Sequence, residues 1–269
     1  MAAYYNEFEP YAAEWLRNLI KKGLIADGEV DERSIVDVSP EDLRGFTQCH
    51  FFAGIAGGPL ALRLAGWPDE RPVWTGSCPC QPFSIGGDGK GFEDERHLWP
   101  EFHRLIAECR PPVIFGEQVA SKAGLVWLDA VFADLEGSGY AAGAVDCCAA
   151  GVGAPHIRQR LWFVAHRLAN AHDTRLEGWG GTIGCEVRAD GQAAARGSCG
   201  GDGAPSQANG CWRDADWLLC RDGGWRPVEP GTRPLAHGIS GRVGRLRAYG
   251  NAVVPQVAAE VIGAYMEIV

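Results

Sequence analysis

The sequence of 269 residues contains no apolar run that approaches the ~20 residues of a membrane-spanning helix. Its first residues, MAAYYNEFEPYAAEW, also lack the basic start and the apolar stretch of a secretion signal. A cytoplasmic protein is therefore expected. Because 46% of the residues are hydrophobic, the chain can build one sizeable packed domain, with or without a small additional module.

Cysteines at the C-x-x-C spacing of zinc sites are missing as well. Ten cysteines are scattered over a chain too long for a disulfide scaffold, so we expect most to be reduced and several to be buried. Four cysteines in the C-terminal half could bind a metal only if folding brought them together in space, and we predict no metal site. These are Cys185, Cys199, Cys211 and Cys220.

The chain also lacks a net positive charge, because its formal net charge is −9. This excludes a protein that coats nucleic acid by charge alone. Local basic stretches exist, namely HIRQR at 156–160 and a set of arginines near the C-terminus. Taken alone, these stretches fit a solvated surface as well as a nucleic-acid contact. The C-terminal set is Arg226, Arg233, Arg242, Arg245 and Arg247.

The hydrophobic pattern predicts short strands that alternate with helices, after a helix over 10–22. The first strand leads into a glycine-rich turn, an arrangement with which α/β folds present backbone N–H groups to nucleotide-like ligands. We therefore predict an α/β fold with a mostly parallel sheet covered on both faces. The predicted strands include 49–53, 72–78, 111–119 and 160–166, and the predicted helices 59–65 and 98–110.

Residues 168–245 differ from the rest in composition. They are rich in Gly, Ala, Arg and Asp and show poor periodicity, which predicts a small, irregular, loop-rich module. The last stretch, RAYGNAVVPQVAAEVIGAYMEIV, returns to a loop and a strong helix. The predicted organisation is an N-terminal helical extension (1–47), a main α/β domain (48–167 and 246–269) and the inserted module (168–245).

Four chemically active side chains are expected at one edge of this sheet. The segments that carry Cys80, Glu117, Arg158 and Arg160 fall at or near strand ends, where open parallel sheets bind their ligands. A thiolate, a carboxylate and two guanidinium groups around one pocket suit attack on an electron-poor ring. The carboxylate can donate a proton to a ring nitrogen or share one with it, and the arginines can hold oxygens and stabilise developing negative charge.

With these residues the chain resembles the DNA cytosine-5 methyltransferases, over about 51–164 and 249–262. GSCPCQPFS is similar to the family's Pro-Cys-Gln nucleophile motif, with Cys80 and not Cys78 on the nucleophile. PVIFGEQV is similar to the motif whose Glu contacts the cytosine ring, matched by Glu117. PHIRQRLWFVA is similar to the Gln-x-Arg-x-Arg motif, with Arg158 and Arg160 on its arginines. GFEDERHLW resembles the mobile loop, and YGNAVVPQV resembles the late segment that packs against the cofactor.

The resemblance implies a Rossmann-like methyltransferase fold that uses S-adenosylmethionine. The target cytosine is flipped out of double-stranded DNA, Cys80 adds to carbon 6, and a methyl group is transferred to carbon 5. The inserted module takes the position of the target-recognition domain, where its arginines are the better candidates for DNA contacts. We expect substrate contacts from Gln81, Ser84, Arg96 and Gln118. Donor contacts are expected from Phe52, Ala53, Gly54, Ile55, Gly57, Pro79, Leu98, Asn251 and Ala252.

The sequence departs from the family around the methyl donor. In the family, a second strand follows the first helix and ends in an acid that holds the ribose, whereas here ALRLAGWPDERPVWTGSC passes almost directly to the nucleophile strand. Because there is no room for that second β-α-β piece, we predict a truncated sheet. Asp69 and Glu70 are the only acids in this stretch. One hypothesis is that residues 1–47 rebuild the missing wall. Other departures are His50, Ala56, Gln118, His156 and Ala252 at positions where the family has Asp, Gly, Asn, Gln and Ser.

Three functional hypotheses remain open at this level. The first is a DNA cytosine-5 methyltransferase with an altered donor pocket. The second keeps the Cys80 chemistry but uses another one-carbon donor or deaminates the base. The third is a DNA-binding relative without catalysis. RNA as the substrate, the oligomeric state, and a role in restriction-modification, phage genome protection or repair also stay open, although the short module hints at a phage origin.

Overall fold

A computed structural model of the chain describes residues 2–79, 98–154, 158–168, 216–219, 225–228 and 252–269. Its elements fall into two compact units, one of residues 1–167 and 235–269 and one of residues 168–234. No helix in the described part is long and apolar enough to cross a membrane.

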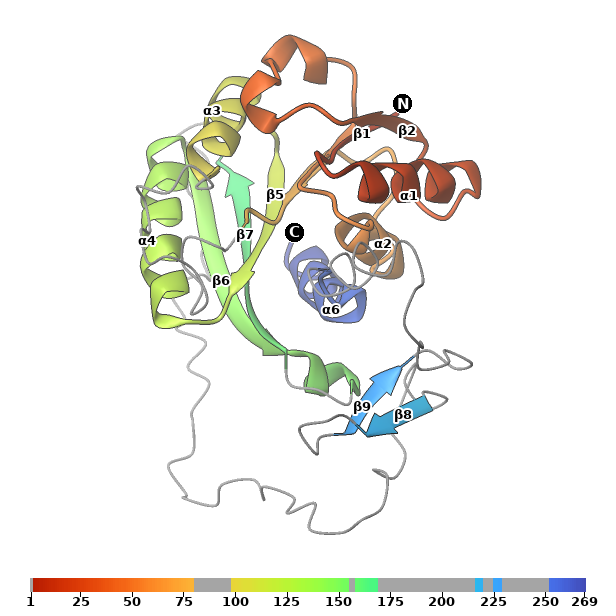
Figure 1. The fold of residues 1–269 in the computed structure, drawn as a ribbon. Helices are drawn as coiled ribbons and strands as arrows, with labels where there is room; N and C mark the ends of the chain where they lie inside the picture. Colours follow the sequence, from red (N-terminus) through yellow and green to blue (C-terminus); the bar gives the residue numbers. More distant parts are fainter. Residues whose placement is uncertain (1, 80–97, 155–157, 169–215, 220–224, 229–251) are drawn as a thin grey trace. The chain divides into compact units, whose positions relative to one another are not determined.

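The larger unit is built on a seven-stranded sheet with the order β2-β1-β3-β4-β5-β7-β6 (Figure 1). The first five strands of this order are mutually parallel, and β7 is antiparallel to both of its neighbours. The strands are β1 (Ala3–Asn6), β2 (Gly28–Asp31), β3 (Gln48–Phe51), β4 (Val73–Gly76), β5 (Val113–Val119), β6 (Tyr140–Cys148) and β7 (Gln159–Arg167).

Helices cover both faces of the sheet (Figure 1). On one face lie α1 (Pro10–Lys21), α2 (Gly57–Leu64) and α6 (Pro255–Met266), and on the other lie α3 (Trp99–Cys109) and α4 (Lys122–Gly137). Short 3-10 helices are η1 (Ile35–Asp37), η2 (Pro40–Leu43) and η5 (Ala149–Val152). The starts of these elements follow capping rules. Glu9 accepts a hydrogen bond from the Ala12 N–H at the start of α1, and Ser39 forms a capping box with Asp42 at the start of η2.

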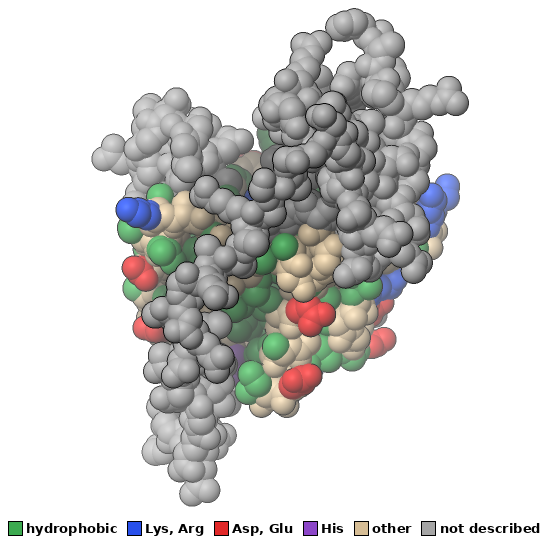
Figure 2. All heavy atoms as spheres, turned by 90° about the horizontal axis from the view of Figure 1, so that it is seen from below, with side chains coloured by type: hydrophobic (Ala, Val, Ile, Leu, Met, Phe, Trp, Pro, Cys, Tyr) green, Lys and Arg blue, Asp and Glu red, His purple; other side chains and the backbone are tan. Residues whose placement is uncertain are grey.

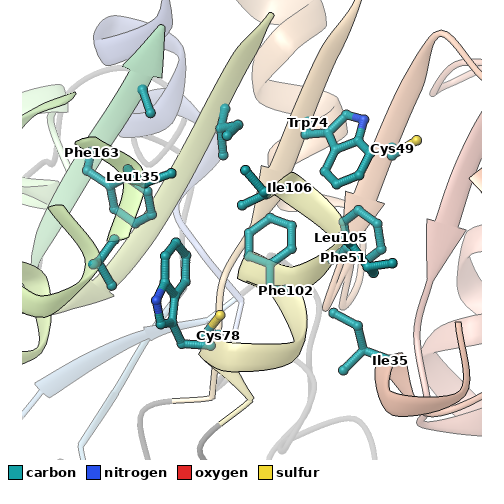
Figure 3. Close-up of a cluster of buried hydrophobic side chains, with 14 of the residues drawn as sticks. Ile35, Cys49, Phe51, Trp74, Cys78, Phe102, Leu105, Ile106, Leu135 and Phe163 are labelled. Carbon is teal, nitrogen blue, oxygen red and sulfur yellow. The ribbon is translucent and has the colours of Figure 1, made fainter. Parts of the chain in front are cut away.

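The main hydrophobic core fills the space between the sheet and the helices α3 and α4 (Figure 3). Phe51, Trp74 and Phe102 contact one another there through tilted and stacked ring pairs. A smaller cluster around Tyr5 and Leu16 packs α1 against the opposite face. Burial of these aromatic and aliphatic side chains fixes the strands whose ends form the site.

The predicted α/β fold is confirmed, and so is the predicted gap between α2 and β4, where no further β-α-β piece is inserted. The expectation of a helical N-terminal extension is incomplete, because residues 1–47 supply strands β1 and β2 as well as the helix α1. Strand β1 pairs with β3 in parallel, with Tyr5 opposite His50 and Asn6 opposite Phe51. The hydrophobic periodicity of the sequence predicted the helix α1. Strands β1 and β2 have only four residues each, too few for an alternating pattern to identify them.

The smaller unit contains a hairpin of β8 (Asp216–Leu219) and β9 (Trp225–Val228), which pair antiparallel. The inserted module was expected over 168–245, and the compact unit spans 168–234. Most of this module, including Trp179 and Trp212, lies outside the described residues, and so do Arg233, Arg242, Arg245 and Arg247.

Candidate active site

One edge of the large sheet gathers the exits of the parallel strands. Residue Glu7 follows β1, the glycine turn at 52–56 follows β3, and Cys78 follows β4 closely. Glu117 lies near the end of β5. Because β7 runs in the opposite direction, its first residues lie at the same edge. The structure therefore brings five segments of the chain to one place.

Glu117 and Arg160 form an ion pair at this edge, with 2.7 Å between Oε1 of the carboxylate and Nε of the guanidinium. The pair is held by the ladder between β5 and β7, in which Glu117 lies opposite Trp162 and Val119 opposite Arg160. Only 13% of the Glu117 side chain is exposed. Burial raises the pKa of this carboxyl above its usual range, although Arg160 and Arg158 act to lower it. A carboxyl with a raised pKa is a better candidate than an ordinary one for sharing a proton with a ring nitrogen.

Arg158 connects the arginine segment to the start of the C-terminal stretch. Its Nη2 donates a hydrogen bond of 2.5 Å to the carbonyl oxygen of Ala252, 94 residues further along the chain. The backbone of Arg158 has a positive φ of 33°, an unusual conformation for a residue with a side chain. The two sequence motifs that the resemblance singled out are thus joined by a direct contact.

The two cysteines of GSCPCQPFS differ in their surroundings. The Cys78 side chain is buried, with 6% exposure, in the core beside Phe102 (Figure 3). Burial strongly raises the pKa of its thiol, and a thiol in apolar surroundings is a poor nucleophile. Cys80 itself lies outside the described residues, but the exclusion of Cys78 agrees with the prediction that Cys80 is the nucleophile.

The glycine turn has a strained backbone and a close neighbour. Phe52, Gly54 and Ala56 all have positive φ angles, of 53°, 55° and 74°. A Cβ atom at Gly57 would collide with the side chain of Val253, so only glycine lets the C-terminal segment approach the start of α2 this closely. The late segment, whose predicted contact is with the cofactor, therefore lies against the start of α2.

Glu7 is a site residue that the sequence analysis missed. Its Oε2 accepts a 2.6 Å hydrogen bond from the N–H of Gly54, and the Ala53 N–H donates to the Asn6 carbonyl at 3.1 Å. The N-terminal segment thus lies against the turn, as the hypothesis of a rebuilt wall requires. The sequence pattern that could have identified Glu7 is an acid that directly follows a short, mostly apolar segment and precedes a helix beginning with proline.

Two of the departures from the family pattern are buried side chains. His50 is fully buried, lies 2.8 Å from the Thr75 hydroxyl through Nδ1 and stacks on Tyr5. Gln118 is 1% exposed, and its Oε1 accepts from the N–H of Val119. Because neighbouring residues of a strand point to opposite faces, Gln118 faces away from the side of Glu117. Its position gives no support to the predicted substrate contact.

The other predicted residues are distributed as follows. Ile55 and Pro79 are half-buried at the edge, and Leu98 precedes α3 and packs against the main core. Cys80, Gln81, Ser84, Arg96 and Asn251 lie outside the described residues, so their expected roles stay predictions. In the part of the chain that the structure describes, no three His, Cys, Asp or Glu side chains gather as metal ligands.

Charge is unevenly distributed on the face seen from below (Figure 2). The described side chains there are mostly hydrophobic or uncharged, with acidic groups between them and basic groups at the margins. The described part of this face is therefore not a basic DNA-binding surface by itself.

Comparison with known proteins gives the same family as the motifs. The family described as C-5 cytosine-specific DNA methylase matches residues 68–177. The type II methyltransferase M.AplI of Arthrospira platensis is 35% identical over 108 residues, which cover 39% of this chain and 30% of that protein. M.HhaI of Haemophilus parahaemolyticus is 36% identical over 172 residues, covering 49% and 53%. The chain thus spans about a third to a half of the length of these relatives.

Solved structures that match part of this chain include a DNMT2 mutant of Spodoptera frugiperda, with a TM-score of 0.41 and 16% identity over 61% of this chain and 42% of that one. The Entamoeba histolytica methyltransferase EhMeth has a TM-score of 0.40 and 16% identity over 63% and 54%. The family match and the curated relatives confirm the resemblance of this chain to the DNA cytosine-5 methyltransferases.

Proposed function

We propose that the protein transfers a methyl group from S-adenosylmethionine to carbon 5 of a flipped-out cytosine in double-stranded DNA. The observation that carries this proposal is the Glu117–Arg160 pair, a mostly buried acid with a raised pKa, at the same sheet edge as the exit of β4. The chain that leaves β4 runs through Cys78 and Pro79 directly to Cys80. The acid and the segment that leads to the proposed nucleophile thus come from neighbouring strands, which supports the proposal.

In the first step, the Cys80 thiolate forms a bond to carbon 6 of the cytosine ring. The electron pair of the 5,6 double bond becomes the C4–C5 double bond, the pair of the C4–N3 double bond moves onto N3, and N3 takes the proton held by Glu117, so that no full negative charge builds up. Removal of a positioned acid typically costs about 10²-fold to 10⁴-fold in rate. Arg160 keeps the carboxyl aimed, and Arg158 contributes positive charge beside it.

The residues around the glycine turn fit a nucleoside donor. The backbone of the turn is left-handed at three positions, and Gly57 lets Val253 close over it. Phe52 packs edge-on against Phe102 of α3, so that the turn is fixed to the core. When bound, S-adenosylmethionine supplies an electrophilic methyl group to carbon 5. Loss of the carbon 5 proton, elimination of the Cys80 thiolate and return of the N3 proton to Glu117 then restore the aromatic ring and the enzyme.

Double-stranded DNA is the proposed partner, with recognition assigned to residues 168–234. An enzyme cannot reach the ring carbons of a cytosine inside a duplex, so this chemistry requires the base to leave the stack. The relatives are type II methyltransferases, which suggests a role in restriction-modification or in protection of a phage genome. A cytoplasmic location in a bacterial or phage-infected cell follows from this role.

The test is nucleoside mass spectrometry on DNA incubated with the purified protein and S-adenosylmethionine. We expect 5-methylcytosine with the wild type and with Cys78→Ala, and none with Cys80→Ala. A parallel incubation with RNA shows whether DNA or RNA is the substrate. Uracil, or a cytosine derivative with another substituent, would support deamination or a different donor instead.

Covalent trapping separates catalysis from binding. Duplex DNA with 5-fluorocytosine at the target should form a stable adduct with the wild type and with Cys78→Ala, but not with Cys80→Ala. If Cys78→Ala were the variant that fails while its melting temperature is unchanged, the assignment of the nucleophile would be wrong. DNA binding without adduct formation by the wild type would identify a non-catalytic relative.

A further inference from the structure

The acids nearest to the nucleophile strand in sequence are at the wrong edge of the sheet. Asp69 and Glu70 precede β4, so they lie at its amino end, opposite the edge that holds Glu117. Asp69 is also paired with Arg63 at 2.9 Å, and Glu70 is exposed. Neither of them can reach a ligand bound at the carboxyl ends of the strands.

Glu7 is an acid at the correct edge, directly after β1 and beside the turn of β3. Its two oxygens accept from the N–H groups of Gly54, at 2.6 Å, and Glu9, at 3.0 Å. In the described part of the chain it has no cationic partner, whereas Asp31 at the end of β2 pairs with Arg33. Burial raises the pKa of the Glu7 carboxyl. A half-buried carboxylate without a cation is costly, and its remaining lone pairs can accept further hydrogen bonds.

Phe8 is a second, independent anomaly next to Glu7. Its side chain is 72% exposed, more than any other large hydrophobic side chain of the described residues. It stands between Glu7 and Glu9, whose carboxylate caps α1, so the backbone on both sides of the ring is fixed. An exposed and anchored aromatic ring is a stacking surface for a purine.

We propose that Glu7 and Phe8 bind the nucleoside part of the methyl donor, the carboxylate accepting from the ribose hydroxyls and the phenyl ring stacking on the purine. This inference deepens the proposed function, and it rests on that function only for the identity of the donor. An acid at the end of the strand beside a glycine turn is the general device with which such sheets hold a ribose. The N-terminal segment therefore completes the pocket, although it precedes the glycine turn in the chain.

The experiment is isothermal titration calorimetry of the full chain with S-adenosylhomocysteine, the donor without its methyl group, in the absence of DNA. We expect Glu7→Gln to weaken binding about 10- to 100-fold, since hydrogen bonds to a charged group are lost. Phe8→Ala should weaken it by a factor of about 5 to 100 through lost stacking. Glu70→Gln and Leu24→Ala, which remove an exposed acid and another exposed apolar side chain, are the matched controls and should bind as the wild type does.

An analogue of S-adenosylhomocysteine without the ribose 2′ and 3′ hydroxyls distinguishes binding from structural support. The wild type should bind this analogue as weakly as Glu7→Gln does, and Glu7→Gln should not distinguish the two ligands. If Glu7→Gln still preferred the hydroxylated ligand as strongly as the wild type, or if the wild type bound neither ligand, the inference would be overturned. Glutamine can still accept from Gly54, and a melting curve for each variant checks the fold.

The proposed methyl transfer can fail separately. Donor binding that depends on Glu7 and Phe8, in a protein that forms no 5-methylcytosine, would leave this inference standing and remove the proposed reaction on DNA.

Discussion

The two sides of the active edge are built in different ways. On the proposed base side, Glu117 comes from β5 and Arg160 from β7, and Arg158 directly precedes β7; these segments are separated along the chain only by α4, β6 and η5. On the donor side, Glu7 reaches the turn at Gly54 from 47 residues earlier. Both sides are fixed by strand pairing, which depends on hydrogen-bond register and not on the order of the strands in the chain. An open sheet can therefore keep a pocket while its pieces change their order.

The base side is expected to show the largest effect of a single substitution. Glu117→Gln keeps the size of the side chain and a hydrogen-bonding group, but it removes the proton that N3 receives. We expect the rate of methyl transfer under single-turnover conditions to fall about 100-fold or more, with DNA affinity nearly unchanged. Glu101→Gln, which disrupts the Glu101–Arg104 ion pair on α3, is a matched control and should keep the wild-type rate.

A large loss of DNA affinity in Glu117→Gln, measured by fluorescence anisotropy, would contradict this assignment and make Glu117 a binding residue. In that case both sides of the edge would bind ligands, and the base side would have no demonstrated role in the chemical step.

The donor side should respond to a change in packing. Gly57→Ala places a methyl group where the Val253 side chain lies, so either α2 or the C-terminal segment must move. We expect the free energy of unfolding to fall by about 1–3 kcal/mol, as for other overpacked sites. The measurement is urea denaturation followed by circular dichroism. Gly263→Ala in α6, where nothing lies within 4 Å of the added Cβ, should instead be neutral or stabilise by about 0.5–1 kcal/mol.

The double variant Gly57→Ala with Val253→Ala tests the cause of that loss. If the collision with Val253 is the reason, the second substitution should recover part of the stability lost in the first. Equal destabilisation with and without Val253 would show that the backbone of the turn, and not the neighbouring side chain, demands glycine.

The sequence predicted the base side better than the donor side, for physical reasons. The strand expected over 111–119 is found as Val113–Val119, because an apolar run that directly follows two prolines is a local signal. The helix expected over 10–22 is found as Pro10–Lys21 for the same kind of reason. The contact of Glu7 with Gly54 has no local signal, since it arises only when β1 pairs with β3. Motif resemblance pointed to Cys80, while the burial that makes Cys78 unreactive is a property of the packed core.

The smallest effect is expected from His50, which lies on the donor side where the family has an acid. Burial lowers the pKa of its imidazole to about 3, against an ordinary value of 6.5, and Asp69 opposes this shift only weakly. Below pH 6.5 the unfolded chain therefore binds a proton that the folded chain does not accept. The free energy of unfolding should lose about 1.4 kcal/mol per pH unit from this group as the pH falls from 6.5 toward 3, while above pH 6.5 the group has no effect.

Other buried groups titrate in the same range, so the informative quantity is the difference between two proteins. Burial also lowers the pKa of His166, while it raises the pKa values of Glu7 and Glu117, which oppose the trend on acidification. His50→Asn can still hydrogen-bond to the Thr75 hydroxyl but does not titrate. Urea denaturation of both proteins from pH 7 to pH 5 should give a shallower loss of stability for the variant. Identical slopes would mean that His50 is protonated in the folded protein, and that the donor side tolerates a buried charge beneath its glycine turn.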